Sequence, residues 1–198
     1  MPRRFRCSKP CSSMTEKQKR DNGELYYAGK DSDFLDEVIK AKDLCYEYNQ
    51  IRPTDFKAQR EILEKLLGKI GEDSVIYPPF WCDYGYNIEM GKGCLANHGL
   101  TILDGAKVRF GDNVLIGPGC YFHTAGHPID PDQRKQWLVY TKPITVGNNV
   151  WFGAGVHVLP GVTIGDNAVI GAGSIVTKDI PADCVAVGNP CKVVNRVK

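Results

Sequence analysis

Several features are missing from this chain of 198 residues, and each absence narrows its class. No run of eighteen apolar residues occurs, so no membrane-spanning helix is expected. The formal net charge is only +2, and no basic stripe is interleaved with aromatics, which argues against nucleic-acid binding. The eight cysteines form no CxxC pair in a chain large enough to have its own core. We therefore expect free thiols and a cytoplasmic protein.

The first thirteen residues also lack features of a secretory signal. Residues 1–13 are basic, contain no acidic residue and have no apolar central stretch. We expect a disordered basic extension there. A short organelle-targeting leader stays an open alternative.

What the chain does contain is a six-residue apolar period between Ile144 and Pro181. A branched or aromatic residue opens each six, and glycine often follows it. Such a period fits neither an α-helix nor an alternating strand, but is typical of a parallel β-helix, in which three short faces make one coil. Three sixes complete a coil, which predicts the following stacked pairs: Val146 on Ile164, Phe152 on Ile170, and Val158 on Val176.

Two helical segments are expected before the repeat. Apolar residues recur at helical spacing from Ser32, and a second segment has Thr54 as its N-cap and ends before Gly68. These helices would cover the open end of the β-helix. The predicted organisation is a helical cap over residues 14–72, a β-helix domain over residues 73–187 with its coils following Pro79, and a tail over residues 188–198.

The repeat has one long interruption. A line opens at Phe122, but the next regular six begins only at Val146, so about one coil's length of chain leaves the cylinder. Excursions of this size inside a compact repeat are usually functional. We expect a protruding loop over residues 123–143, which contains His123 and His127.

Four segments resemble the maltose/galactoside O-acetyltransferases. They are Gly126-His127-Pro128 in the loop, DYGYN at residues 83–87, PITVGNNVW at residues 143–151, and VTKDIP at residues 176–181. The resemblance covers Met14 to Val194. It implies a mainly β fold, built as a left-handed parallel β-helix, and a homotrimer with active sites between subunits. It also implies that acetyl-CoA lies in the groove between two neighbouring β-helices, and that no metal is needed.

The resemblance also implies residue roles. His127 would be the general base that takes a proton from a sugar hydroxyl as its oxygen attacks the thioester, without a covalent enzyme intermediate. The backbone N–H of Ala154 would stabilise the oxyanion. The implied acceptor-binding residues are Asp83, Asn97 and Asp104. The implied residues for coenzyme binding are Ala154, Ala172, Thr177, Lys178, Lys192 and Asn195.

Departures from the family pattern leave the acceptor open. Val139 stands where the family loop usually carries glutamate, and Gly105 follows Asp104, so that acceptor aspartate is either Asp104 or displaced by one position. An apolar loop would suit a less polar acceptor, such as an antibiotic hydroxyl, or a catalytically weak scaffold. Trp81, Trp137 and Tyr86 are aromatic residues able to stack on a sugar ring.

A further alternative is a β-helical carbonic anhydrase, which holds zinc with three histidines across a trimer interface. His98, His123 and His127 are available here. The last two, however, are separated by three residues and not by the usual four. The intact VTKD segment at residues 176–179 also favours the acetyltransferase interpretation.

Overall fold

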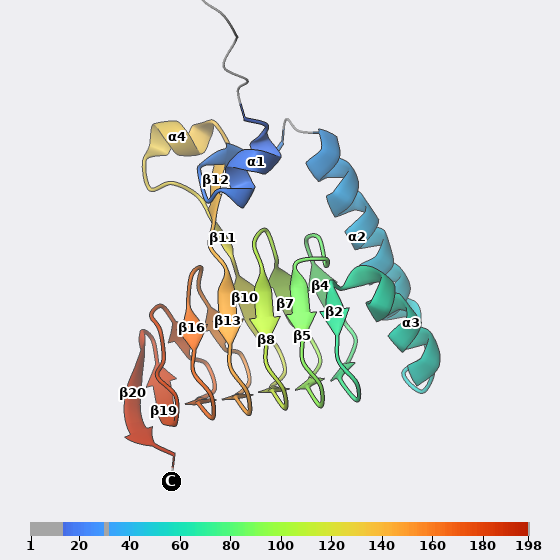
Figure 1. The fold of residues 1–198 in the computed structure, drawn as a ribbon, viewed down its shortest axis with the longest axis vertical. Coiled ribbons are helices and arrows are strands. Elements are labelled where there is room, and N and C mark those ends of the chain that lie inside the picture. The colour runs from blue at the N-terminus through green and yellow to red at the C-terminus, as the bar shows by residue number, and fades with distance from the viewer. Residues whose placement is uncertain (1–13, 30–31, 198) are drawn as a thin grey trace, which may run out of the picture.

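The structure is a computed structural model that describes residues 14–29 and 32–197 (Figure 1). The predicted basic extension over residues 1–13 lies outside the described residues. Most of the described chain winds into a parallel β-helix whose short strands stack in three sheets, and a smaller group of elements projects from one side. No helix in the described ranges combines the length and apolarity that a membrane span requires.

Each of the three sheets collects one face of the successive coils. Face 1 contains β2 (Lys69–Ile70), β5 (Ile88–Met90), β8 (Val108–Phe110), β13 (Ile144–Val146) and β16 (Thr163–Ile164). Face 2 contains β3 (Val75–Ile76), β6 (Leu95–Ala96), β9 (Leu115–Ile116), β14 (Trp151–Phe152), β17 (Val169–Ile170), β19 (Cys184–Gly188) and β20 (Cys191–Arg196). Face 3 contains β4 (Phe80–Cys82), β7 (Leu100–Leu103), β10 (Tyr121–His123), β15 (His157–Val158) and β18 (Ile175–Val176).

The predicted stacking of the sixes is confirmed. Three register pairs match those expected from the period: Val146 with Ile164, Phe152 with Ile170, and Val158 with Val176. These side chains point inward and are buried, since alternate residues of a strand face opposite sides. One continuous apolar core therefore runs along the axis of the coils.

Aromatic rings fill the middle of this core. Phe122 is fully buried, and its ring centroid lies 4.9 Å from that of Phe110 and 5.3 Å from that of Phe152. Both pairs are edge-to-face, the arrangement that the ring quadrupole favours. Phe110 and Phe122 belong to one coil and Phe152 to the next, so these rings join two consecutive coils just before the chain leaves the β-helix.

Asparagines form the corner between faces 1 and 2. Asn113, Asn149 and Asn167 have φ values of 56°, 57° and 60°, a left-handed conformation that asparagine tolerates better than most residues. Their side-chain amides bond to one another along the stack, and Asn167 donates to Asp183. The corner asparagines of the repeat therefore serve both the turn and the stacking of coils.

Two helices cover the first coil, as expected (Figure 1). They are α2 (Ser32–Gln50) and α3 (Phe56–Leu66). The side chain of Asn49 in α2 bonds both the N–H and the carbonyl of Phe80, at 2.8 and 3.0 Å. The predicted N-cap Thr54 is wrong by one residue, because the Asp55 carboxylate accepts the bond from Ala58 N–H.

The β-helix also begins earlier than predicted. Lys69 and Ile70 pair with Glu89 and Met90 in the same parallel register as later coils. The first coil therefore begins before Pro79, and the predicted boundary between residues 72 and 73 falls inside it. Lys69, Glu89 and Arg109 pair at a spacing of 20 residues, against 18 residues for Val146 and Ile164, and this longer period concealed the early coils in the sequence.

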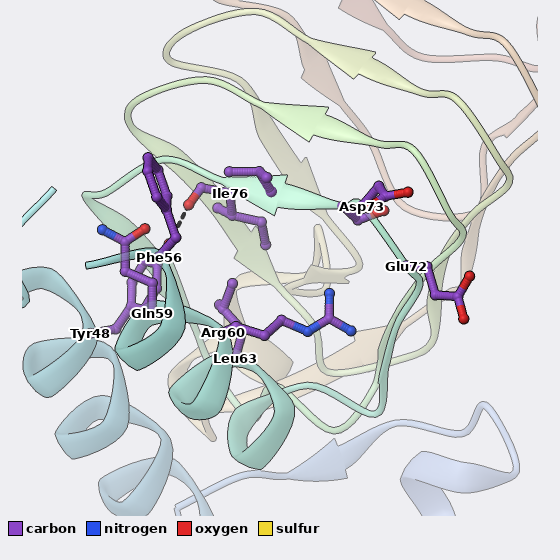
Figure 2. A pocket seen from close by; sticks show the side chains of 10 residues that line it. Tyr48, Phe56, Gln59, Arg60, Leu63, Glu72, Asp73 and Ile76 are labelled. Carbon is purple, nitrogen blue, oxygen red and sulfur yellow. Dashed lines mark hydrogen bonds between the residues drawn. The ribbon is translucent and has the colours of Figure 1, made fainter. Parts of the chain in front are cut away.

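A cavity of about 380 Å³ lies between α3 and the first coil (Figure 2). Arg60 reaches from α3 into this junction and donates to the carbonyls of Ile70 and Gly71 at 2.8 and 2.9 Å. The Tyr48 hydroxyl donates to the Ile76 carbonyl. These polar groups already fasten the cap to the coil, so we assign the cavity a structural role.

The interruption of the repeat is ordered, not an irregular loop. It contains β11 (Ala125–Gly126), α4 (Pro131–Lys135) and β12 (Leu138–Thr141). Together with β1 (Tyr26–Tyr27), β12 and β11 form a three-stranded antiparallel sheet, and α1 (Glu16–Asp21) lies close to it in Figure 1. His123, predicted as a loop residue, belongs to β10. The C-terminal tail returns as β20, antiparallel to β19.

Candidate active site

The projecting sheet fixes the position of His127. Gly126 pairs with Tyr140 across β11 and β12, and His127 follows directly. Its Nδ1 atom lies 2.9 Å from the carbonyl oxygen of Leu138. Because a carbonyl only accepts hydrogen bonds, Nδ1 carries the proton, and Nε2 of the neutral ring keeps its lone pair. The exposed imidazole therefore presents an unprotonated nitrogen.

An inner cavity of about 430 Å³ joins His127 to the N-terminal segment. Asp83, which follows β4, lines the same cavity. The structure thus brings together two predicted site residues that lie far apart in the sequence. Much of the remaining lining is aliphatic and includes Ala28, Leu35, Val38, Leu103 and Val139.

An outer cavity of about 570 Å³ lies beside His127. Its other lining residues come from α4 and the residue that precedes β12: Pro131, Arg134, Lys135 and Trp137. His127 is the residue common to the two cavities. His127 therefore lies between the inner and the outer cavity.

A buried arginine holds the N-terminal wall of the inner cavity in place. The Arg20 guanidinium lies 4.8 Å from the ring centroid of Phe34 and 5.4 Å from that of Tyr84, within range of cation–π attraction. Arg20 also donates to the Tyr86 hydroxyl, which donates in turn to Glu37. Sequence reasoning missed this network, because a single arginine in a short polar helix carries no distinctive signal.

Asp104 lies beneath the inner cavity and does not line it. It is fully buried, and its Oδ1 accepts bonds from the backbone N–H groups of Asp83 and Tyr84 at 3.0 and 2.9 Å. Gly105 lines the cavity in its place. Asp104 therefore supports the turn that carries Asp83. Burial raises the pKa of Asp104 to about 6, and burial also raises the pKa of Asp83.

This buried carboxyl predicts a pH dependence of stability. The pKa of Asp104 is about 6 in the fold, against 3.8 for an ordinary aspartate, so between these values the folded chain binds more protons than the unfolded chain. Stability contributed by this group is therefore lost as pH rises. Asp104→Asn keeps an acceptor for both N–H groups, so relative to the variant, wild type is expected to lose about 2 kcal/mol between pH 4 and pH 7.

Urea unfolding of both proteins at a series of pH values and one protein concentration measures this difference. If the free energy of unfolding depended on pH in the same way for wild type and Asp104→Asn, the assignment would be contradicted.

The predicted acceptor residue Asn97 and the predicted coenzyme residues lie elsewhere on the β-helix. Asn97, Ala154 and Ala172 share the edge between faces 2 and 3, where successive turns bond to each other, as in Gly173 N–H to the Ala154 carbonyl at 2.8 Å. Ala154 and Ala172 are exposed. None of these residues lines either cavity next to His127. The remaining predicted coenzyme residues are also exposed; Thr177 and Lys178 follow β18, and Lys192 and Asn195 lie on β20.

Faces 1 and 2 differ in the side chains that they turn outward. Register pairs align a polar row on face 1: Lys69, Glu89, Arg109, Thr145 and Thr163. On face 2 the corresponding row is apolar throughout: Val75, Leu95, Leu115, Trp151, Val169 and Val185. Leu115 and Trp151 are 49% and 54% exposed in the single chain. A contiguous apolar row of this length is typical of a protein interface.

Comparisons with known proteins agree with this geometry. The model described as maltose acetyltransferase hexapeptide capping motif matches residues 19–71, and the bacterial transferase hexapeptide model matches residues 143–178. A putative acetyltransferase of Saccharomyces cerevisiae is 50% identical over 88% of this chain and 89% of its own length. Galactoside O-acetyltransferase of Escherichia coli is 45% identical over 80% of this chain and 78% of its own length. The chain belongs to the maltose/galactoside O-acetyltransferase family.

Solved structures of the family share the whole architecture. A maltose O-acetyltransferase from Clostridium difficile superposes with a TM-score of 0.91 at 43% identity, covering 93% of this chain and 98% of its own. A galactoside acetyltransferase in complex with coenzyme A gives a TM-score of 0.91 at 40% identity, covering 94% and 92%. The predicted fold class, a left-handed β-helix with a helical N-terminal segment, is confirmed, and the chain is an acyltransferase by family.

Family membership also bears on the zinc alternative. Within the described residues, no group of three histidine, cysteine, aspartate or glutamate side chains is placed to hold a metal ion. His98 bonds the Pro78 carbonyl on one edge of the β-helix, while Nε2 of His123 lies 3.2 Å from Nδ1 of His157 on face 3. The maltose/galactoside family relationship favours acyl transfer over a carbonic anhydrase activity.

Proposed function

We propose that the protein is an acetyl-CoA-dependent O-acetyltransferase that acetylates a hydroxyl of a sugar or glycoside. The observation that carries the proposal is His127, whose Nδ1 is engaged by the Leu138 carbonyl and whose Nε2 is left for proton transfer. Support comes from the family, which contains galactoside O-acetyltransferases and a galactoside acetyltransferase solved with coenzyme A.

In the proposed reaction, His127 Nε2 takes the proton of the acceptor hydroxyl while that oxygen attacks the thioester carbonyl. The tetrahedral intermediate carries an oxyanion, for which the Ala154 N–H is the proposed donor. No acceptor for this N–H is found in the described part of the chain, so it is available. Collapse breaks the carbon–sulfur bond, and the imidazolium returns its proton to the departing thiolate. The products are an acetyl ester and CoA.

We further propose that a homotrimer completes this site. His127 and Asp83 lie beside the projecting sheet, whereas Ala154 and Asn97 lie on the edge between faces 2 and 3. A neighbouring copy is needed to bring an Ala154 edge to a His127 edge. The apolar outward row of face 2 supports burial of this face between subunits, and the polar row of face 1 suits solvent.

The coenzyme would follow the small-residue edge. Ala154 and Ala172 leave room for the pantetheine chain to approach the backbone. Thr177 and Lys178 would lie near the adenine end, and the ammonium of Lys192 would neutralise a phosphate. Asn195 stands where the family has a second arginine, and it offers an amide without charge.

The aliphatic lining of the inner cavity favours a second candidate function. The side chains of Ala28, Leu35, Val38 and Val139 offer no hydrogen bonds to replace those that sugar hydroxyls lose on leaving water, so a hydroxyl on an apolar antibiotic-like compound also fits. Val139 replaces the family's loop glutamate, which removes one charged partner for sugar hydroxyls.

A panel of acceptors tests the proposal and separates the two candidates. Purified protein, acetyl-CoA and one acceptor at a time are assayed for CoA thiol release, with glucosides, galactosides, maltose and chloramphenicol-like alcohols as acceptors. We expect release to depend on a glycoside. Release with the antibiotic-like alcohols alone would favour the second candidate, and acceptor-independent release throughout would contradict both.

A further inference from the structure

Trp137 has an unusual backbone conformation for its residue type. It follows Gln136, the C-cap of α4, and its N–H donates to the Arg134 carbonyl at 3.0 Å. Its φ is +58°, in the left-handed region that glycine or asparagine normally occupies just after a helix. A bulky aromatic residue in this position is strained, and such strain is often kept where it serves a ligand.

The indole contributes little to the fold. Trp137 is 69% exposed and belongs to neither buried hydrophobic cluster of the described chain. Where an exposed residue after a helix has a left-handed backbone conformation, replacing it with glycine relaxes the backbone and loses little packing. The tryptophan is therefore unexplained by stability.

The position of the indole points to the reaction. Trp137 and His127 line the same outer cavity, and the next residue, Leu138, supplies the carbonyl that orients the imidazole. Pro131 adds a second apolar surface to this cavity. Arg134 donates to the carbonyls of Pro128 and Ile129, which ties α4 to the segment carrying His127. Trp137 and His127 are thus held by one short structural unit.

We propose that Trp137 is a stacking platform for the acceptor, so that the outer cavity takes a ring with a flat apolar face next to the reacting hydroxyl. Such a face belongs to the CH side of a pyranose or to an aryl group attached to it. The inference rests on the proposed function and adds a specificity-determining residue to it.

The test compares Trp137→Gly and Trp137→Phe with wild type. We expect Trp137→Gly to raise the KM for the acceptor about tenfold, with kcat and the KM for acetyl-CoA changed less than about twofold. Its urea midpoint should equal or exceed that of wild type, since glycine suits the backbone. Trp137→Phe should retain most of the acceptor affinity. Methyl and phenyl glycosides distinguish the pyranose from the aryl group as the stacked ring.

Fluorescence gives a readout that does not depend on turnover. Titration of wild type with a glycoside, without acetyl-CoA, should change the tryptophan emission, and Trp137→Phe should remove that change. A Trp81→Phe control, whose residue lines neither cavity, should keep it.

Three results would overturn the proposal: an unchanged acceptor KM in Trp137→Gly, a rise in the KM for acetyl-CoA instead, or dissociation of the oligomer in sedimentation. Acceptor binding without any acetyl transfer would reject the proposed function but keep the platform.

Discussion

Replacing His127 with alanine is expected to lower acceptor-dependent CoA release by about 10²-fold or more. The imidazole Nε2 is the proposed base, and alanine leaves the acceptor hydroxyl to lose its proton to water. Because the ring is exposed and makes one hydrogen bond, to the Leu138 carbonyl, its removal should leave the fold intact. Steady-state kinetics, with the far-UV circular dichroism spectrum and coenzyme binding as controls, measure the effect. A rate within about threefold of wild type would eliminate the role of general base.

The same variant tests whether the site is shared between subunits. Ala154→Trp should also be inactive, because its indole fills the proposed coenzyme edge. If each site combines His127 of one copy with Ala154 of another, co-expressing the two variants restores about one quarter of the sites in random trimers. If both edges belonged to one chain, mixing would restore none.

Phe122→Ala is expected to destabilise the protein by about 3–5 kcal/mol. The side chain is fully buried, and its ring meets Phe110 and Phe152 edge-to-face, so alanine leaves a cavity that the neighbouring coils cannot easily close. Urea unfolding followed by circular dichroism measures the loss.

A matched control is Phe56→Ala, since Phe56 begins α3 and is 61% exposed. This change should cost less than about 1 kcal/mol. Equal losses for the two phenylalanines would contradict the assignment of Phe122 to the central core.

The β-helix was predictable because its period leaves a direct mark in the sequence. Every coil needs an inward apolar residue at fixed spacing. The positions of Val146, Phe152 and Val158 therefore predict their partners one coil later. The first coil was hidden because its strands pair with the next coil at a spacing of 20 residues, as in Lys69 with Glu89, which breaks the regular period of six. Thr54 and Asp55 are both competent N-caps, and only the backbone geometry selects Asp55.

The site was less predictable from sequence. His127 was identified through the family motif, and its hydrogen bond to Leu138 depends on how β11 and β12 pair. Asp104 reads as a polar residue for ligand contact, yet tertiary packing buries it under Asp83. The left-handed backbone of Trp137 has no sequence signal, because the residue type expected there is glycine.

The two ends of the β-helix have a consequence for the behaviour of the protein at high concentration. A stack of parallel coils without covered ends exposes unpaired strand edges, through which identical chains join end to end into fibres. Helices α2 and α3 cover the first coil, and β20 turns back antiparallel beside β19 at the other end (Figure 1). These terminal elements therefore block end-to-end polymerisation, and the chain itself fixes the number of coils in one molecule.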